Sequence, residues 1–322
     1  SGEMYVLTDA TTDANVWSNI GTGEGNIPYV FQGSIDAYIS GGIVVSSPKH
    51  NNIQKFSFSS NTTGTDLGDL TRTNYLSDGT SSNTHGYSPG GLSVSTIDKF
   101  QFSTSNNATS HGSLTAVRHS SSSSNSETEG FVFGGQSYLS TIEKYAFSSN
   151  TTAATHGNLT EASNDKIGSS SITHGFASGG YSNGLSPTVR TTIDKFAFAS
   201  NTTAASHGDL ITLRSHGAGT SSLTDGYASG GANAGGDTAV IEKYSFASNT
   251  TATSHGNLSQ ARDGAANSSH TTHGYSSGGQ RNSGPGNASI TLIDKFAYAS
   301  NTTATSHGSL VQGSYAAAGH QF

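Results

Sequence analysis

Hydrophobic and polar positions follow one six-residue phrase that recurs six times along the chain. Each copy begins with isoleucine, continues with an acidic or amide residue and a lysine, and places two aromatic residues two positions apart. The copies begin at Ile53, Ile97, Ile142, Ile193, Ile241 and Ile293. Residues two apart share one face of a β-strand. The phrase therefore predicts a strand that is partly apolar on both faces, as in a sheet packed between two other sheets.

The spacing between these phrases and the Gly-Gly pairs of the chain is constant. From each of the first five isoleucines to the second glycine of the next Gly-Gly pair is 38 residues, ending at Gly91, Gly135, Gly180, Gly231 and Gly279. From Gly-Gly to the following isoleucine, the six copies have 10, 5, 6, 12, 9 and 13 intervening residues. A module of fixed length is repeated, and one loop per copy is free to vary.

The rest of the module predicts three more short strands. After the phrase come a turn such as Ser200–Thr203, an outer strand ending in His-Gly-x-Leu, and an inner strand of small residues such as Gly219–Ser221. The last strand carries an aromatic residue and closes on Gly-Gly. Four strands in about 45–50 residues correspond to one β-propeller blade, and helical periodicity is absent. We therefore predict an all-β, six-bladed propeller of four-stranded blades.

The two ends of the chain suggest how the ring closes. The first copy begins at Ser34–Tyr38 without an inner strand, whereas Ala317–Phe322 is a surplus inner strand. We expect this C-terminal strand to complete the first blade and remove exposed sheet edges. The propeller is predicted over 31–322, and 1–30 is predicted to be a connector with short strands in Met4–Ala10 and Asn15–Gly21.

Composition narrows the classes of partner. Charged residues make up 11% of the 322 residues and the net charge is -7, unlike the basic footprint of a nucleic-acid binder. No apolar run approaches the ~18 residues of a membrane span. The chain has no cysteine, which excludes disulfides and thiol chemistry. We expect neither a nucleic-acid partner nor membrane insertion.

The loops of unequal length should gather on one side of the propeller. The connection after Gly-Gly lies on the same side as the connection into each inner strand, and we call this side the loop face. The six loops are Ile43–Asn52, Leu92–Thr96, Gln136–Thr141, Tyr181–Thr192, Ala232–Val240 and Gln280–Leu292. Loops on a rigid scaffold often carry binding residues. The candidates, which can stack on or hydrogen-bond a sugar or a protein, are Tyr181, Arg190, Arg281, Asn282, Tyr138 and His50. The alternative is that these loops have merely drifted, since surface loops tolerate insertions.

Two histidine series recur in register, and both are expected to be structural. The first is His111, His156, His207, His255 and His307, with Leu67 in the first copy. The second is His85, His174 and His273, replaced by Glu129 and Asp225 in two copies. Equivalent positions on neighbouring sheets lie about 10 Å apart, whereas a zinc ligand lies about 2 Å from its metal. No metal site is therefore predicted.

Two further sets of residues receive structural predictions. The phrase lysines are expected to lay their stems on the neighbouring blade and bond across blades, the alternative being a charged binding stripe. Small inner-strand residues are expected to line a water-filled central channel, the alternative being a bound ion or small polar ligand. These residues are Thr80, Ser124, Ser169, Thr220, Ser268 and, from the closing strand, His320.

The module resembles the kelch repeat. The shared features are Gly-Gly, the variable loop, the aromatic strand, the Asn-Thr turn and a following arginine, as at Arg118, Arg214 and Arg262. It departs from kelch in lacking a repeat tryptophan, because the single tryptophan, Trp17, lies outside the repeats. The resemblance implies a propeller and carries no particular kelch function.

Enzymatic readings of the sequence are weak. Galactose oxidase shares a kelch-like fold but needs a cysteine-modified tyrosine, and sialidase-type propellers carry Ser-x-Asp-x-Gly-x-Thr-Trp boxes that this chain lacks. A nucleophile elbow, a phosphate loop and a close glutamate pair are also missing. We expect no catalysis and no cofactor, and keep a propeller hydrolase or lyase as a minor alternative.

The wording of the repeats resembles kelch-like repeats in structural proteins of marine tailed phages of the cyanophage type. The matching phrases are Ile-Asp-Lys-Phe, Ser-His-Gly-Asp-Leu and Thr-His-Gly-Tyr-x-Ser-Gly-Gly. The resemblance implies a non-enzymatic recognition or structural module on a virion surface or tail fibre. Its expected partners are host surface glycan or envelope protein and other virion structural proteins, with homo-oligomers allowed. The alternative is a secreted or cell-surface lectin.

Overall fold

The computed structural model describes residues 5–9, 16–19, 30–44, 49–282 and 288–322. The chain forms two units, Ser1–Val30 and Phe31–Phe322. In the first unit, β1 (Tyr5–Asp9) pairs antiparallel with β2 (Val16–Asn19), within the ranges predicted for strands. None of the described residues belongs to a helix long and apolar enough to cross a membrane.

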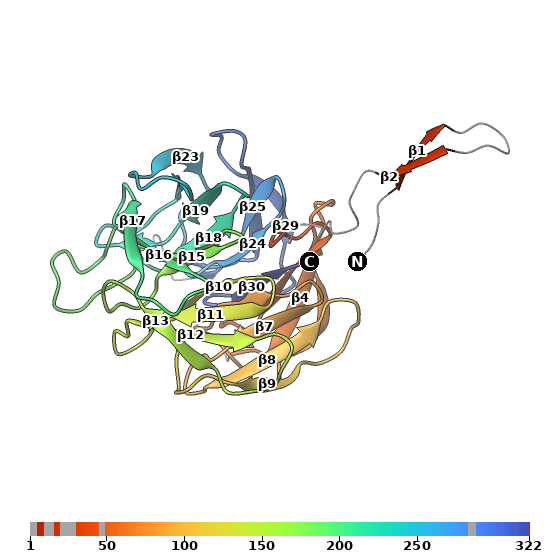
Figure 1. The fold of residues 1–322 in the computed structure, drawn as a ribbon. Helices are drawn as coiled ribbons and strands as arrows, with labels where there is room; N and C mark the ends of the chain where they lie inside the picture. Colours follow the sequence, from red (N-terminus) through yellow and green to blue (C-terminus); the bar gives the residue numbers. More distant parts are fainter. Residues whose placement is uncertain (1–4, 10–15, 20–29, 45–48, 283–287) are drawn as a thin grey trace. The chain divides into compact units, whose positions relative to one another are not determined.

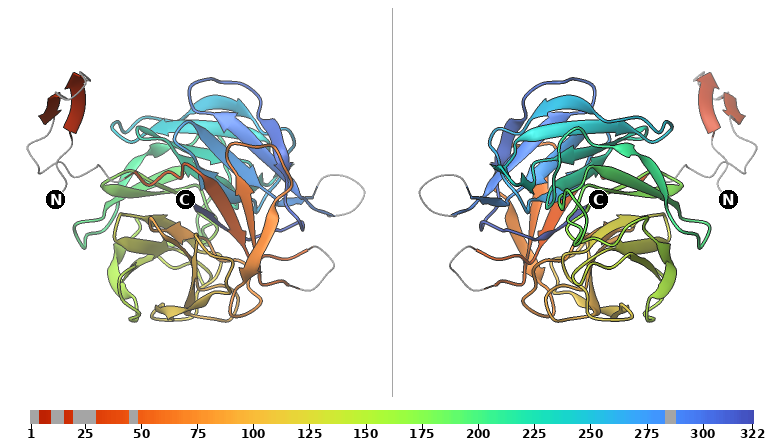
Figure 2. Two further views of the ribbon diagram at one scale, coloured as in Figure 1. Left: turned by 90° about the vertical axis from the view of Figure 1, so that its right-hand side faces the viewer. Right: turned by 90° about the vertical axis from the view of Figure 1, so that its left-hand side faces the viewer.

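The described residues of the second unit form six four-stranded antiparallel sheets around one axis, which confirms the predicted β-propeller (Figures 1 and 2). From the inner to the outer strand, blade 1 has β30 (Ala318–Gln321), β3 (Asp36–Ser40), β4 (Asn52–Ser57) and β5 (Thr65–Asp69). Blade 2 has β6 (Thr80–Ser81), β7 (His85–Pro89), β8 (Thr96–Gln101) and β9 (Thr109–Ser113). Blade 3 has β10 (Ser122–Asn125), β11 (Glu129–Phe133), β12 (Thr141–Ala146) and β13 (Ala154–Asn158).

The other three blades repeat this order. Blade 4 has β14 (Ile167–Ser170), β15 (His174–Ser178), β16 (Thr192–Ala197) and β17 (Ala205–Asp209). Blade 5 has β18 (Ala218–Ser221), β19 (Asp225–Ser229), β22 (Val240–Ser245) and β23 (Thr253–Asn257). Blade 6 has β24 (Ala266–Ser269), β25 (His273–Ser277), β28 (Leu292–Ala297) and β29 (Thr305–Ser309). Two variable loops form small hairpins, β20 (Ala232–Asn233) with β21 (Gly236–Asp237), and β26 (Gln280–Arg281) with β27 (Ala288–Ser289).

The ring closes as predicted. The C-terminal strand β30 pairs antiparallel with β3, with Tyr38 opposite His320 and Ser40 opposite Ala318. The Phe322 carbonyl accepts hydrogen bonds from the backbone N–H groups of Ser34 and Ile35 at 2.9 and 2.8 Å. The two ends of the propeller are therefore joined by backbone hydrogen bonds within a single blade.

The hydrophobic core is divided into six clusters, one at each seam between neighbouring blades. At each seam an aromatic residue of the phrase packs on the aromatic residue of the preceding blade's second strand. Phe246 stacks on Phe176 with ring centroids 4.5 Å apart, and Tyr298 stacks on Tyr227 at 4.6 Å. Aromatic burial is the main apolar contribution of such a sheet packing. Each phrase thus supplies the aromatic residues of one side of a seam, and the preceding blade supplies the other side.

In blades 2 to 6 the residue before the second-strand aromatic is a glycine, and a close approach within the blade accounts for it; blade 1 has Ala37 at this position. A Cβ atom on Gly175 would lie 2.3 Å from Cζ of Phe196, and one on Gly86 would lie 2.3 Å from Cζ of Phe100. The phrase aromatic lies flat across this glycine. A side chain at the glycine position of blade 2 or blade 4 would require the phrase aromatic to move.

The first histidine series lies at β-bulges and bonds across seams. In blade 3, Ile142 pairs with Gly157 and Glu143 with Thr155, which leaves His156 as the extra residue and turns its side chain toward the next blade. The Nε2 atoms lie 2.7–2.9 Å from carbonyl oxygens of the following blade, in the pairs His111–Ala146, His156–Ala197, His207–Ser245, His255–Ala297 and His307–Ser57. The predicted structural role of this series is confirmed, and blade 1 replaces the bond with the apolar side chain of Leu67.

Each seam also contains a buried polar link that begins at the residue after the phrase isoleucine. In three seams this residue binds an arginine from the connection that leaves the preceding blade. The pairs are Arg118–Glu143 at 2.7 Å, Arg214–Glu242 at 2.5 Å and Arg262–Asp294 at 2.5 Å. All six of these side chains are almost completely buried. A buried charge is tolerated only when it is paired and hydrogen-bonded.

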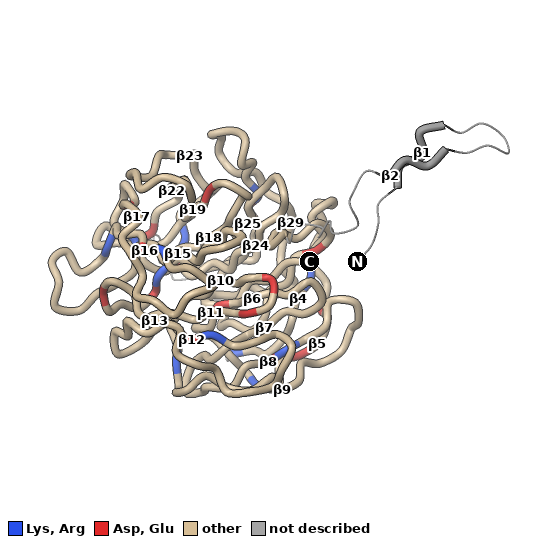
Figure 3. The backbone as a smooth tube through the Cα atoms, viewed as in Figure 1, with Lys and Arg blue, Asp and Glu red and all other residues tan. Residues whose placement is uncertain are grey.

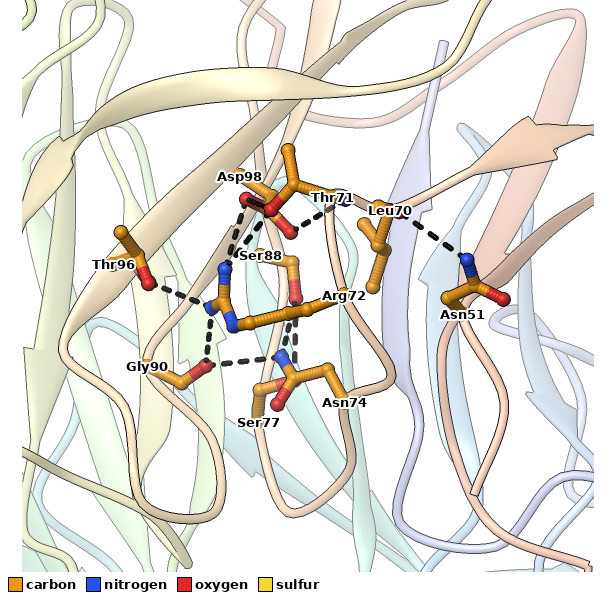
Figure 4. A network of polar contacts seen from close by, with 10 residues as sticks. All are labelled: Asn51, Leu70, Thr71, Arg72, Asn74, Ser77, Ser88, Gly90, Thr96 and Asp98. Carbon is orange, nitrogen blue, oxygen red and sulfur yellow. Dashed lines mark hydrogen bonds and ion pairs between the residues drawn. The ribbon is translucent and has the colours of Figure 1, made fainter. Parts of the chain in front are cut away.

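The seam between blades 1 and 2 reaches the same arrangement from a different position (Figure 4). Asn74 occupies the arginine position and donates to the Gly90 carbonyl at 3.0 Å. Arg72, two residues earlier, binds Asp98 at 3.0 Å and donates to the carbonyls of Gly90 and Thr96 at 3.3 and 3.1 Å. The buried carboxylate of the seam needs a positively charged partner, and an arginine at either of two positions in the connection can provide it.

The phrase lysines mostly act inside their own blade. Lys55 pairs with Asp36 at 2.7 Å, and Lys144 pairs with Glu129 at 3.0 Å. Lys195 donates across its seam to the Phe246 carbonyl at 3.2 Å. The prediction of bonds across blades therefore holds for Lys195 and is wrong for Lys55 and Lys144. The acid beside the lysine makes the cross-blade link instead.

Candidate functional site

A closed ring of six backbone hydrogen bonds surrounds the axis at the loop face. Its members are the equivalent residues before each inner strand, Leu76, Ser120, Asp165, His216, Gly264 and Ala316. Each N–H donates to the carbonyl of the preceding member at 2.8–3.0 Å. All six have a φ between 52° and 59°, a left-handed conformation that non-glycine residues keep only when surrounding structure enforces it. The ring fixes the side chains around the loop-face end of the axis, which we call the mouth.

The variable loops are anchored directly outside this ring, which confirms that they share the loop face. The N–H of the second glycine of each Gly-Gly donates to the connection that leads into the next inner strand. Gly180, for example, donates to the Arg214 carbonyl at 2.8 Å. The next loop residue pairs with the residue before the ring, as Tyr181 does with Asn164 through two backbone bonds of 2.9 and 3.0 Å. Loop length varies, but the attachment is the same.

The channel prediction is wrong for several of the residues named. Thr80 and Ser169 bond the hydroxyls of Tyr145 and Tyr244 at 2.5 Å, so both lie in seams. Ser268 donates to the His320 carbonyl at 3.0 Å, and the His320 ring lies between Ser40 and Thr80. Neighbouring residues of a strand point to opposite sides, so a prediction that is wrong by one residue reverses the assignment. The residues next to those named, at the alternate positions of the inner strands, face the axis instead.

These alternate residues close the channel with a ladder of side-chain hydrogen bonds. The N–H groups of successive inner strands donate to side-chain oxygens of the next strand at 3.0–3.3 Å. The donor and acceptor pairs are Asn125 to Ser170, Ser170 to Ser221, Ser221 to Ser269, Ser269 to Gln321 and Gln321 to Ser81. A Cβ atom on Gly219 would lie 2.0 Å from the Gly168 carbonyl oxygen. The inner strands are therefore too close together for a wide passage.

The end of the axis opposite the loop face is covered by the residues with which the chain enters the propeller. Gln32 donates its side-chain amide to the Ser221 carbonyl at 3.2 Å, and Gln321 donates to the Phe31 carbonyl at 2.9 Å. Phe31 is buried and lines the remaining axial cavity of about 30 Å³. Among the described residues, Phe31, Gln32 and Gln321 therefore cover this end of the axis.

A histidine–aspartate pair lies in the hydrogen-bonded ring at the mouth. His216 Nε2 lies 2.8 Å from Asp165 Oδ1. Burial alone would lower the pKa of His216, but the charge and hydrogen bond of Asp165 outweigh it and raise this pKa above its ordinary value. Burial raises the pKa of nearby Asp263 to about 6. The mouth is thus polar, with a histidine whose pKa is raised and an aspartate whose pKa is about 6.

Asn282 connects this mouth to two variable loops. Its backbone N–H donates to Asp237 Oδ2 at 2.6 Å. Its side-chain amide donates to Asp237 Oδ1 at 3.1 Å and to Asp263 Oδ1 at 3.3 Å. A single amide therefore bridges carboxylates from the connections around blades 5 and 6.

An open groove of about 310 Å³ lies beside the mouth, between the loops of blades 4 and 5. Its lining residues are Tyr181, Thr188, Val189, Ser215, Ala232, Asn233 and Ala234. The Tyr181 ring also faces the Tyr138 ring of the neighbouring loop, with centroids 6.0 Å apart and planes inclined by 34°. A partly apolar groove with an aromatic wall and a few polar groups is the usual form of a small-molecule site.

The six binding residues predicted from the sequence lie in different surroundings in the structure. Tyr138 and Tyr181 lie next to each other, and Asn282 is hydrogen-bonded to the carboxylates of Asp237 and Asp263. Arg190 is bound to Glu161, with Nε and Nη2 each 3.1 Å from a carboxylate oxygen, and lies at the base of its loop. His50 is half-buried, with Nε2 3.1 Å from the Ser314 hydroxyl in the closing seam. Arg281 is exposed on the β26–β27 hairpin.

The mouth residues Asp165, His216, Asp237 and Asp263 were missed from sequence. Asp165 and His216 occupy the same register position in successive copies, but the other copies have leucine, serine, glycine and alanine there. The sequence held one signal for this pair. When this position is compared across the six copies, only Asp165 and His216 are ionisable, and the other residues are small or apolar.

The distribution of charged and metal-ligating residues also bears on what the loop face can bind. Charged residues are sparse and scattered over the blades, with neighbouring positive and negative positions (Figure 3). The described part of the chain contains no group of three or more His, Asp or Glu residues arranged to hold a metal ion.

No protein-family model matches this chain, and no curated protein sequence is significantly similar to it. The resemblances to kelch repeats and to phage structural proteins therefore remain predictions from the repeat wording.

Proposed function

We propose that this propeller is a non-enzymatic recognition module that binds host surface glycan through its loop face. Its proposed setting is a virion surface or tail fibre, where it contacts other virion structural proteins. The observation that carries the proposal is the groove beside Tyr181, which combines an aromatic wall with hydroxyl and amide groups. The rest of the loop face supplies the polar mouth.

The chemistry of the groove fits a saccharide. The apolar face of a sugar ring can lie on a tyrosine ring, and Tyr181 lines the groove with Val189 and two alanines. Ser215, Thr188 and Asn233 offer hydroxyl and amide groups to sugar hydroxyls. Tyr138 extends the aromatic surface beyond the groove. A neutral or hydroxyl-rich ligand therefore finds both contacts that it needs.

The chain enters the propeller on the opposite side. Phe31 and Gln32 are buried against the far ends of the inner strands, so residues 31–36 leave the loop face uncovered.

Envelope protein is the second candidate ligand, favoured by exposed apolar side chains beside the same loop. Leu185, Ile211 and Leu213 are 43%, 55% and 37% exposed. The segment that carries Ile211 and Leu213 is bonded to the loop base, since the Arg214 N–H donates to the Arg190 carbonyl at 3.3 Å. Exposed apolar residues that cluster are typical of protein contacts.

The proposal is tested by glycan-array binding of the wild type and two tyrosine variants. Tyr181→Ala removes the groove wall and is expected to abolish binding. Tyr75→Ala removes a half-exposed tyrosine from the other side of the loop face and is expected to leave binding unchanged. Thermal melts of both variants establish that they fold. Equal binding by the wild type and Tyr181→Ala would contradict the glycan site, and release of free sugar would contradict the non-enzymatic proposal.

A further inference from the structure

The tip of the loop Tyr181–Thr192 carries the single Asn-Gly sequence of the chain, Asn183–Gly184. The tip is closed by a hydrogen bond from the Ser182 N–H to the Thr188 carbonyl at 2.8 Å. Asn183 and Gly184 are both exposed. Gly184 has a φ of 80°, and a Cβ atom added there would meet no other atom within 4 Å. No hydrogen bond from another described residue restrains the Asn183 carboxamide.

We propose that Asn183 is a site of spontaneous deamidation. The backbone nitrogen of Gly184 attacks Cγ of Asn183, so an N–Cγ bond forms and the bond from Cγ to Nδ2 breaks. The departing NH2 group takes up the proton lost by the Gly184 nitrogen and leaves as ammonia. Water then opens the cyclic imide and yields aspartate or isoaspartate. The net reaction consumes one water and releases one ammonia, with no change in oxidation state.

The residue after the asparagine decides where this attack can occur. Glycine has no side chain to hinder the approach of its nitrogen and samples the required backbone conformations freely. Asparagines in five of the six repeat turns are instead followed by threonine, whose branched side chain crowds and stiffens the backbone. These are Asn61, Asn150, Asn201, Asn249 and Asn301.

Three Asp-Gly sequences provide an internal comparison, because aspartate can form the same cyclic imide. Their glycines are enclosed. An added Cβ would lie 2.2 Å from the Gly319 carbonyl oxygen at Gly79, 2.5 Å from the Tyr244 ring at Gly226 and 2.2 Å from the Tyr315 ring at Gly264. The backbone there cannot rotate into the attacking geometry without moving a strand or a ring. Asn183 combines the reactive Asn-Gly sequence with a glycine that has open space around its Cα atom.

Deamidation would change the loop that forms one wall of the groove. Either product adds a negative charge, and isoaspartate also adds a carbon to the backbone between Ser182 and Thr188. We expect weaker binding of acidic glycans after the reaction. This consequence rests on the proposed function, whereas the modification itself does not.

The test is incubation of the purified full chain at mildly alkaline pH, followed by peptide mass spectrometry and enzymatic detection of isoaspartate. The peptide containing Asn183 should gain the mass of an amide-to-acid conversion at least about tenfold faster than the peptide containing Asn201. Asn183→Gln should remove this product and Asn201→Gln should not. Conversion of Asn183 no faster than Asn201 would overturn the proposal.

A separate arm examines the consequence for binding. Asn183→Asp carries the product charge from the start and is compared with the wild type on acidic and neutral glycans. Weaker binding of acidic glycans alone supports the link to the groove. Unchanged binding removes that link, while the mass measurement decides the modification independently.

Discussion

The seams and the loops after Gly-Gly come from the same repeat, yet they vary in different ways. In the seams the contacts are kept while the residues change: Arg118 binds Glu143, and Arg72 from a different position binds Asp98. In the loops only the attachment at the second glycine is kept, and the rest changes in length and sequence. A seam must pair every buried charge, whereas a loop in water meets no such requirement. Stability is therefore expected to reside in the seams and recognition in the loops.

The largest effect is expected from removal of the closing strand. Deletion of 317–322 takes β30 from blade 1 and leaves β3 as an exposed sheet edge. It also removes the Phe322 carbonyl that accepts from Ser34 and Ile35. We expect loss of cooperative thermal unfolding, measured by circular dichroism. A melting curve like that of the full chain would show that the ring does not depend on this closure.

The next effect comes from breaking a buried ion pair. Arg214→Met leaves Glu242 buried without its partner and should lower the free energy of unfolding by about 3–5 kcal/mol. The double variant Arg214→Met/Glu242→Leu removes both charges and should recover most of this loss. Chemical denaturation measures both variants.

The closing seam supplies the matched control for that experiment. There Gln54 replaces the acid and donates to the Ser314 hydroxyl at 3.3 Å, without a charge. Gln54→Leu should cost only about 1–3 kcal/mol. A loss in Arg214→Met no larger than in Gln54→Leu would refute the importance of charge pairing at the seams.

Acid pH should weaken the seams through their histidines. Burial lowers the pKa of His320 from 6.5 to about 4 and also lowers the pKa of His207 and His307. The unfolded chain then binds protons that the folded chain does not, so this contribution is complete above pH 6.5 and declines as the pH falls toward 4. For His320 the loss is roughly 3 kcal/mol.

Urea unfolding of the wild type at several pH values, compared with His320→Gln, measures this contribution. The variant should show a shallower decline with falling pH. His216 has the opposite sign, because its raised pKa contributes stability that is present below the ordinary pKa and is lost as the pH rises through the folded value. Identical pH profiles for the two proteins would contradict the assignment to His320.

The smallest expected effects concern the histidine bulges. His255→Leu leaves the Ala297 carbonyl without its donor and should cost about 1–3 kcal/mol. Leu67→His introduces the missing donor in blade 1, opposite the equivalent carbonyl of Gln101, and should add about 0.5–1.5 kcal/mol. Destabilisation by Leu67→His would show that blade 1 has repacked around leucine.

The fold was predictable from sequence because a seam needs large residues at fixed spacing. The isoleucine, the two aromatics and Gly-Gly recur at constant separations, and each contacts the same partner in every blade. The inner strands carry no such signal. Their residues are small on both sides, so sequence could not show which of Thr80 and Ser81 faces the axis.

The site was less predictable because it joins residues from different copies. Tyr181 was found as an exposed aromatic in a long loop, but its neighbour Ser215 comes from the connection after blade 4. Arg190 looked equally suitable until the structure showed that Glu161 binds its Nε and Nη2 atoms. Whether a loop cation is free depends on partners that sequence spacing does not reveal.

The division between seams and loops is tested most directly by exchanging one loop tip. Residues 182–188 are replaced by a Gly-Ser turn that keeps Tyr181 and the anchoring bond of Gly180, and melting temperature and glycan binding are measured on the same preparation. The account predicts an unchanged melting temperature and lost binding. Retained binding, or a melting temperature lowered as far as in Arg214→Met, would contradict it.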